Sequence, residues 1–204
     1  SEWTSTGAAS ALTIANDGDS KGNYFKFAQD ISVAANRGAY AEFSYADGIK
    51  PTGKYTISTD VSLTAGVVAQ RSESAFAILG TDAAGYNANS SVSSGYILKL
   101  FNTPPSTTSA GSSDYSLQNV WYINDTDATV TIPVGEWVNI KAEVDTAAGT
   151  ADVTISQEGT VLFEGTVAIS GSGELYGMQL LRGRGYGTIS VDTVAVTVEE
   201  AGSG

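Results

Sequence analysis

Aromatic and amide side chains are concentrated in one segment of the sequence. Tyr115, Asn119, Trp121 and Tyr122 lie within a short stretch of the chain. A flat aromatic ring packs against the apolar face of a pyranose, and an amide group beside it hydrogen-bonds the sugar hydroxyls. We predict that these four residues contribute to carbohydrate binding.

The alternation of a strand separates the two largest rings of this segment. In a strand over residues 119–124, Trp121 and Tyr122 point to opposite faces of the sheet. One ring is then expected at the surface, and the sequence leaves open which one. The competing interpretation is that both rings are buried.

A second candidate segment combines arginines with glycines. Arg182, Arg184 and Tyr186 alternate with glycines, and two of the four arginines of the chain lie here. Glycine lets a ligand approach the backbone, and a guanidinium group can bind hydroxyls or a uronate carboxylate with two hydrogen bonds. These residues are predicted to bind carbohydrate, with pairing to nearby acidic residues as the structural alternative.

Oxygen-rich side chains near the N-terminus suggest a cation site. Asp17 and Asp19 stand in a compact turn, and pairing of the first and last strands would bring Asp192 to them. Calcium prefers several such oxygen ligands. Asp17, Asp19 and Asp192 are therefore predicted to bind a structural calcium ion, and an ordinary Asx turn is the alternative.

The composition limits the partners. Asp and Glu number 22 against 10 Lys and Arg, which gives a net charge of −12. This sign repels nucleic acids and anionic membranes. The sequence also lacks the run of about 20 apolar residues that a membrane-spanning helix needs. We expect no nucleic-acid or membrane partner, and a monomer.

Short segments in which apolar and polar residues alternate are expected to form the strands that position the candidate residues. Tyr55, Ile57, Val61 and Leu63 share one face of a strand over 54–64, and residues 137–145 repeat the pattern. Further strands are expected over 23–28, 38–45, 74–80, 95–102, 119–124, 153–155, 160–168, 176–182 and 187–198. This number of strands in 204 residues predicts an all-β chain with a two-sheet antiparallel β-sandwich.

Loops and an irregular strand provide further candidates. The least regular stretches are 81–94, which Tyr86 and Tyr96 flank as weaker candidates, and 103–113. Apolar positions in the last strand change phase near Asp192 and Thr193, which predicts a β-bulge there. Trp137 falls on the non-core face of its strand, and we expect a loop to cover it.

Two segments resemble known sandwich domains. Residues 134–145, with Gly135 and Trp137 near their start, and the hairpin that continues to 155 resemble the Gly-x-Trp strand of laminin-G-like domains. Residues 187–196 resemble the closing strand of β-sandwich carbohydrate-binding modules. The resemblance implies a concanavalin-A-like jelly roll that belongs to a secreted bacterial enzyme degrading plant cell walls, and it strengthens the expectation of calcium.

Some concanavalin-A-like proteins are endo-β-glucanases, whose catalytic strand resembles Glu-x-Asp-x-Glu. Glu143 and Asp145 match half of this motif, but residues 147 and 148 are both alanine. Retaining hydrolysis needs two carboxyl groups about 5 Å apart, so another strand would have to supply the partner. The chain also has no His and no Cys, which excludes a Ser-His-Asp triad and a thiolate nucleophile. We predict that it is not an enzyme.

The sequence as a whole predicts a non-catalytic carbohydrate-binding module that targets an attached catalytic domain to plant cell-wall polysaccharide. The expected ligand is β-glucan, xyloglucan or another hemicellulose, or pectin if Arg182 and Arg184 face it. An adhesin or structural spacer of a bacterial surface protein is the alternative, and a glycoside hydrolase is the second. Residues 1–200 are expected to form one domain, with 201–204 as a linker or tail.

Overall fold

A computed structural model describes residues 3–7, 12–16, 21–28, 39–45, 52–64, 74–86, 91–105, 119–182 and 188–199 of the chain. Within these ranges it contains fourteen β-strands, and none of the described residues is helical. None of these ranges therefore includes a helix suited to crossing a membrane. The prediction of an all-β chain is confirmed.

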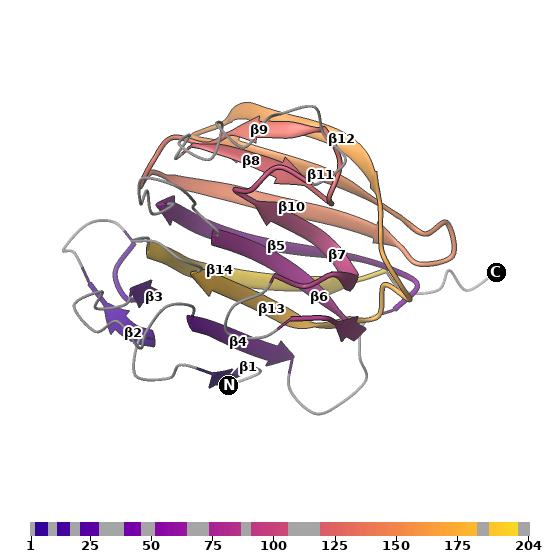
Figure 1. The fold of residues 1–204 in the computed structure, drawn as a ribbon, viewed down its shortest axis with the longest axis horizontal. Coiled ribbons are helices and arrows are strands. Elements are labelled where there is room, and N and C mark those ends of the chain that lie inside the picture. The colour runs from indigo at the N-terminus through magenta and orange to yellow at the C-terminus, as the bar shows by residue number, and fades with distance from the viewer. Residues whose placement is uncertain are drawn as a thin grey trace.

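The strands form two antiparallel sheets that stack as a sandwich (Figure 1). Sheet A has the order β1 (Trp3–Gly7), β4 (Ala39–Tyr45), β13 (Leu175–Arg182), β6 (Ser74–Ala84), β7 (Ser94–Phe101), β8 (Val120–Ile123) and β9 (Thr129–Thr131). Sheet B has the order β12 (Thr160–Ala168), β11 (Thr150–Gln157), β10 (Trp137–Asp145), β5 (Lys54–Thr64), β14 (Thr188–Val198), β3 (Tyr24–Ala28) and β2 (Leu12–Ala15).

The expected strands and the observed ones agree for most of the chain. Strands β1, β2 and β9 were not expected, and β6 continues four residues past the predicted end at 80, to Ala84. These three strands have only three to five residues, which is too short for a clear alternating pattern. The assignment of residues 1–200 to one domain, with 201–204 as a linker, stays a prediction.

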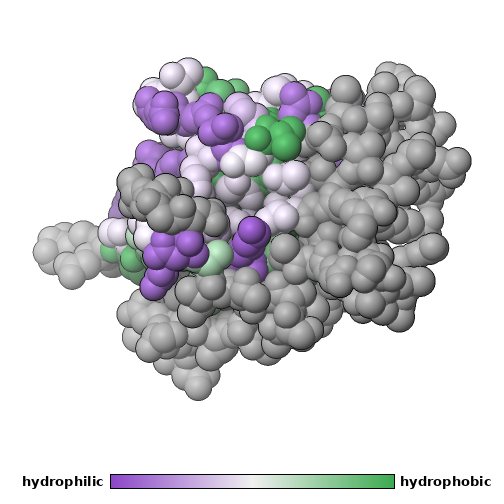
Figure 2. Space-filling view, turned by 90° about the vertical axis from the view of Figure 1, so that its left-hand side faces the viewer, coloured by the Kyte–Doolittle hydropathy of each residue, from purple (hydrophilic) through white to green (hydrophobic). Residues whose placement is uncertain are grey.

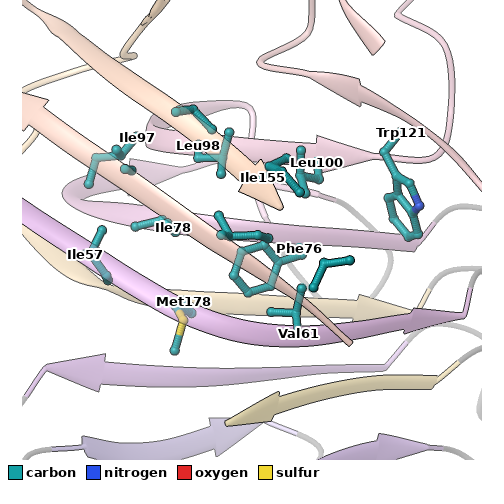
Figure 3. Close-up of a cluster of buried hydrophobic side chains, with 14 of the residues drawn as sticks. Ile57, Val61, Phe76, Ile78, Ile97, Leu98, Leu100, Trp121, Ile155 and Met178 are labelled. Carbon is teal, nitrogen blue, oxygen red and sulfur yellow. The ribbon is translucent and has the colours of Figure 1, made fainter. Parts of the chain in front are cut away.

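The hydrophobic core lies between the two sheets. In β5, buried and half-exposed residues alternate along the strand, and β10 shows the same pattern. Figure 3 shows core side chains from both sheets, among them Ile57 and Ile155 of sheet B and Phe76 and Leu98 of sheet A. Apolar side chains on one face of each sheet therefore hold the sandwich together, as the sequence pattern predicts.

Trp121 belongs to this core. Its side chain has no exposed surface, and Figure 3 shows the ring among the buried side chains. Tyr122, the next residue, is half-buried on the other face of sheet A. The alternation has therefore placed Trp121 inside and Tyr122 outside. The prediction that Trp121 stacks on a sugar is wrong, because a fully buried ring cannot contact a ligand.

The central strands of sheet A are covered on their outer face as well. Residues 74–80 of β6 are all buried. Val92, in the connection between β6 and β7, packs with Ala77, Leu79 and Tyr96 in a second apolar cluster. The backbone N–H of Val92 donates to Oε1 of the buried Gln179 at 3.1 Å. Val92 therefore covers part of the middle of the outer face.

The predicted bulge in the last strand is present. The register between β14 and β5 shifts between Asp192 and Ala195, and Thr193 has a φ of 51°. Ile189 and Val191 point into the core before the bulge, and Val194 and Val196 pack against it afterwards. The extra residue thus keeps both apolar sets on one face.

Hydrophilic residues predominate on the described surface of the side shown in Figure 2, with small hydrophobic areas between them. The exposed large hydrophobic residues among the described ones are Phe25, Val134, Val161 and Val198. They come from different segments of the chain, and scattered apolar residues of this kind are normal on a protein surface.

Gly95 should be intolerant of a side chain. An added Cβ would lie 2.4 Å from the carbonyl carbon and oxygen of Asp82, and the φ of Gly95 is +74°. We expect Gly95→Ala to lower the free energy of unfolding by more than about 2 kcal/mol, since the left-handed backbone alone costs alanine roughly 1–2 kcal/mol. Gly149→Ala is the control, because Gly149 has a φ of +69° but open space around it. Equal losses in urea unfolding would contradict the role of the close approach.

The burial of Trp121 gives a second prediction. Its Nε1 has no hydrogen-bond partner among the described residues. Trp121→Phe removes this unpaired donor, which offsets part of the lost packing, whereas Trp121→Ala should cost about 3–5 kcal/mol. Thermal unfolding of both variants measures the difference. A Phe variant as unstable as the Ala variant would show that the indole is required.

Candidate functional site

A β-bulge in β7 determines which of its residues face outward. Tyr96, Leu98 and Leu100 alternate in the sequence and would share one face of a regular strand. The register shifts here, since Leu98 pairs with Ile78 but Tyr96 pairs with Leu79. Leu98 and Leu100 stay in the core, whereas Tyr96 joins the cluster on the outer face. The bulge has thus re-aimed an aromatic side chain, as bulges near functional sites often do.

Two further residues of β7 face outward beside Tyr122. Lys99 and Phe101 alternate with core residues, and Phe101 pairs in register with Tyr122 of β8. Both rings are half-buried. The Lys99 ammonium lies 5.6 Å from the ring centroid of Tyr96 and 5.1 Å from that of Phe101. We call Tyr96, Lys99, Phe101, Tyr122 and Asp125 the β7–β8 site.

The turn after β8 places Asp125 over this strand. Asn124 and Asp125 both have positive φ, 49° and 54°, which asparagine and aspartate tolerate better than most residues. The Asn124 side-chain amide donates to the carbonyl oxygens of Ile97 and Ala168, each at 3.1 Å. Its Oδ1 accepts the backbone N–H of Lys99 at 2.7 Å, and its own backbone N–H donates to the Lys99 carbonyl. Asn124 therefore fixes the turn to β7.

Asp125 holds the ammonium of Lys99. Nζ donates to both carboxylate oxygens, at 2.8 Å and 2.9 Å, and the Tyr96 hydroxyl donates to Oδ2 at 3.1 Å. The Lys99 side chain is 5% exposed and that of Asp125 is 37% exposed. Burial, and then the negative charge of Asp125, raise the pKa of the Tyr96 hydroxyl. This hydroxyl therefore stays protonated and keeps donating.

The arrangement can bind a hydroxyl-rich ligand. The rings of Phe101 and Tyr122, which are register partners, offer an aromatic surface, and the partly exposed carboxylate of Asp125 binds the ammonium that lies 5.1 Å from the Phe101 ring centroid. A carboxylate has about four acceptor positions, of which Lys99 and Tyr96 occupy three. Asp125 can therefore accept from a ligand hydroxyl without losing its protein contacts.

The structure describes only some of the predicted sugar-binding residues. Tyr115, Arg184 and Tyr186 lie outside the described residues. Arg182 ends β13, which is separated from β7 by β6, and the structure describes only its backbone. Asn119 precedes β8 and accepts the backbone N–H of Ile132 with its carbonyl oxygen. The role of these residues stays a prediction.

The carbohydrate-binding residues predicted from the sequence do not include Lys99, Phe101 or Asp125. One signal was available, since Lys99 is a charged residue within a strand that is otherwise apolar from Tyr96 to Phe101. A lysine in such a strand is almost never buried unless it is paired. The partner was not evident, because Asp125 reaches it through a turn between other strands.

Trp137 lies on the outer face of sheet B, as its position in the strand predicts. The ring is half-buried and makes an edge-to-face contact with Tyr24, with ring centroids 5.1 Å apart. The ammonium of Lys21 lies 4.9 Å from the Trp137 ring centroid. Residues of β3 and of the turn before it therefore partly cover this ring.

The residues described around Asp192 do not form a calcium site by themselves. Asp192 pairs in register with Asp60, whose carboxylate binds the Lys21 ammonium and accepts Nδ2 of Asn139 at 2.9 Å. A cationic group thus already lies beside Asp60. The described part of the chain holds no group of three acidic, His or Cys side chains that suits a metal. Asp17 and Asp19 lie outside it.

A carboxylate does stand opposite Glu143, on the neighbouring strand. Asp152 of β11 is its register partner, and both side chains are exposed on the outer face of sheet B. Glu143 pairs with Lys141 at 3.5 Å, and Asp152 accepts from the hydroxyl of Thr166 at 2.5 Å. A glycosidase acid needs a sheltered environment, which this open strand face does not provide.

Comparison with known proteins identifies the fold. No model of a protein family matches the sequence, and no curated protein matches it. Solved structures do match. The seed lectin of Lotus tetragonolobus has a TM-score of 0.58 and 10% identity, over 98% of this chain and 94% of the lectin. Lectin II from Ulex europaeus has a TM-score of 0.58 and 13% identity, over 96% and 92% of the two chains.

A third similar structure is the exoplasmic/lumenal domain of VIP36 in its Ca²⁺/Man3GlcNAc-bound form. It has a TM-score of 0.58 and 11% identity, over 98% of this chain and 86% of that domain. The agreement extends over nearly the whole chain at very low identity. The fold is therefore the concanavalin-A-like sandwich of legume-lectin-like carbohydrate-binding domains, as the sequence predicts.

Proposed function

We propose that this chain is a non-catalytic carbohydrate-binding domain and that the β7–β8 site contacts the sugar. One observation carries the proposal: the half-buried rings of Phe101 and Tyr122 are register partners, and the Lys99 ammonium, 5.1 Å from the Phe101 ring centroid, is bound by the partly exposed carboxylate of Asp125. Similar solved structures support it, since two of them are named as lectins and a third is bound to Man3GlcNAc.

The proposed complex uses two kinds of contact. A pyranose ring packs its apolar face on Phe101 and Tyr122, and one of its hydroxyls donates to Asp125. Thr129 lies next to Tyr122 in register on β9 and is exposed, so its hydroxyl extends the polar border of the site. The hydrogen bonds of Asn124 hold Asp125 in place before the ligand arrives, which lowers the entropy cost of binding.

The finer assignment follows the sequence resemblance. We propose plant cell-wall polysaccharide as the ligand, in the form of β-glucan, xyloglucan or another hemicellulose. The domain then acts as a monomer in a secreted bacterial protein and keeps an attached catalytic domain close to its substrate. Tethering of this kind raises the effective concentration of the enzyme, so modest affinity is sufficient.

Affinity electrophoresis through gels that contain single polysaccharides tests the site. We expect retardation of the wild type without release of sugar, and weaker retardation of Phe101→Ala and Tyr122→Ala. Loss of one stacking ring should weaken binding by roughly fivefold to thirtyfold, which corresponds to about 1–2 kcal/mol. Phe25→Ala is the matched control, because this ring is 42% exposed on β3 of the other sheet.

Each outcome of this experiment has a distinct meaning. Unchanged binding by both site variants would place the sugar elsewhere on the sandwich. Equal weakening by Phe25→Ala would point to a general loss of stability, which circular dichroism would reveal. No retardation of the wild type by any polysaccharide would overturn the proposed function and favour an adhesin or spacer domain.

Calcium binding by Asp17, Asp19 and Asp192 is also part of this proposal. We expect calcium to raise the midpoint of thermal unfolding and a chelator to reverse the rise, since an ion that binds only the folded state stabilises it. Asp17→Asn should abolish the effect. A midpoint that calcium and chelator leave unchanged in the wild type would rule out this site.

A further inference from the structure

We propose that the β7–β8 site selects neutral glycans and discriminates against acidic ones, because the cation it contains is buried and already paired. This inference rests on the proposed function, since it concerns the ligand of the same site.

The ammonium of Lys99 is shielded from a ligand carboxylate by burial and by its own partners. It has three N–H donors, and both oxygens of Asp125 accept from it. The rings of Tyr96 and Phe101 lie within 5.6 Å of it. Its side chain is only 5% exposed. A ligand therefore meets the carboxylate of this ion pair, and the ammonium lies behind it.

The surrounding sequence supplies no second cation. Between Arg71 and Lys141, Lys99 is the only basic residue of the chain. Asp127, in the same turn as Asp125, is exposed. Since the net charge of the chain is −12, nothing in the overall field compensates for this local excess of negative charge.

The same groups suit a neutral ligand. The exposed oxygens of Asp125 are hydrogen-bond acceptors, and the hydroxyls of a neutral sugar are donors. A uronate carboxylate is an acceptor itself, so it would face Asp125 without a proton between them. Neutral hydroxyls gain a charge-assisted hydrogen bond at this position, whereas a carboxylate is repelled.

A matched pair of ligands isolates the charge. Polygalacturonate and its full methyl ester share one backbone, and so do a C6-carboxylated β-glucan and its methyl ester. We expect the wild type to bind a carboxylated polymer roughly fivefold to tenfold more weakly than its neutral ester at an ionic strength of about 0.01 M. At about 0.15 M the difference should shrink, because salt screens charges at the surface.

Two variants with the same net charge distinguish the effect of the site's own charges from the effect of the net charge of the chain. Asp125→Asn leaves Lys99 uncompensated in nearly the same geometry, and it should reduce the preference for the neutral ester by at least about threefold. Glu143→Gln removes one negative charge from an exposed position on sheet B and should leave the preference unchanged.

The results separate this inference from the proposed function. Binding of the carboxylated polymers as strong as that of their esters, or stronger, would overturn the inference and implicate Arg182 and Arg184, while carbohydrate binding itself would stand. An equal effect of the two variants would assign the discrimination to net charge and overturn the role of Lys99. If Asp125→Asn does not fold, the wild-type comparison alone decides. No binding of any polysaccharide, neutral or acidic, would remove the proposed function and the inference together.

Discussion

The hydrogen bonds of Asn124 are the constraint on which the candidate site depends. Its side chain joins the bulged segment of β7 to the end of β12, and so connects the two sheets. The residue is buried, and its side-chain donors and acceptor are matched to backbone groups of Ile97, Lys99 and Ala168. A residue of another type would leave these groups unpaired, at a cost of about 1–3 kcal/mol each. Because Asn124 is fixed, the position of Asp125 follows from it.

The ion pair of Lys99 and Asp125, next to Asn124, positions a carboxylate more than it stabilises the fold. Replacing a buried ion pair with apolar residues of similar size is often neutral or stabilising, so Lys99 and Asp125 are not needed to hold the sandwich together. What the pair does is orient a partly exposed carboxylate, which also accepts from the hydroxyl of Tyr96. Removing only Asp125 should destabilise the protein, since an unpaired Lys99 would remain among aromatic rings.

Much of the fold could be predicted from the sequence, because the alternation of β5 and β10 follows directly from which residues meet the core. The phase change at Asp192 was readable for the same reason. The site was harder to predict. The bulge in β7 reverses the face on which Tyr96 lies, and the apolar pattern around it gives no sign of an extra residue. Trp121 was wrongly predicted to bind sugar. Strand alternation places Trp121 and Tyr122 on opposite faces of the sheet, but it does not determine which of the two rings faces the core.

The position of the site near one edge of sheet A also has a physical cause. A ligand cannot reach Ala77 and Leu79 in the middle of this face, because Val92 packs on them and both are fully buried. The buried Gln179 strengthens this cover by accepting the backbone N–H of Val92. Towards β8 and β9 the outward residues become half-buried or exposed, which makes rings and hydroxyls accessible. The apolar cover thus leaves the proposed ligand contact to the part of the sheet where Asn124 fixes the position of the Asp125 carboxylate.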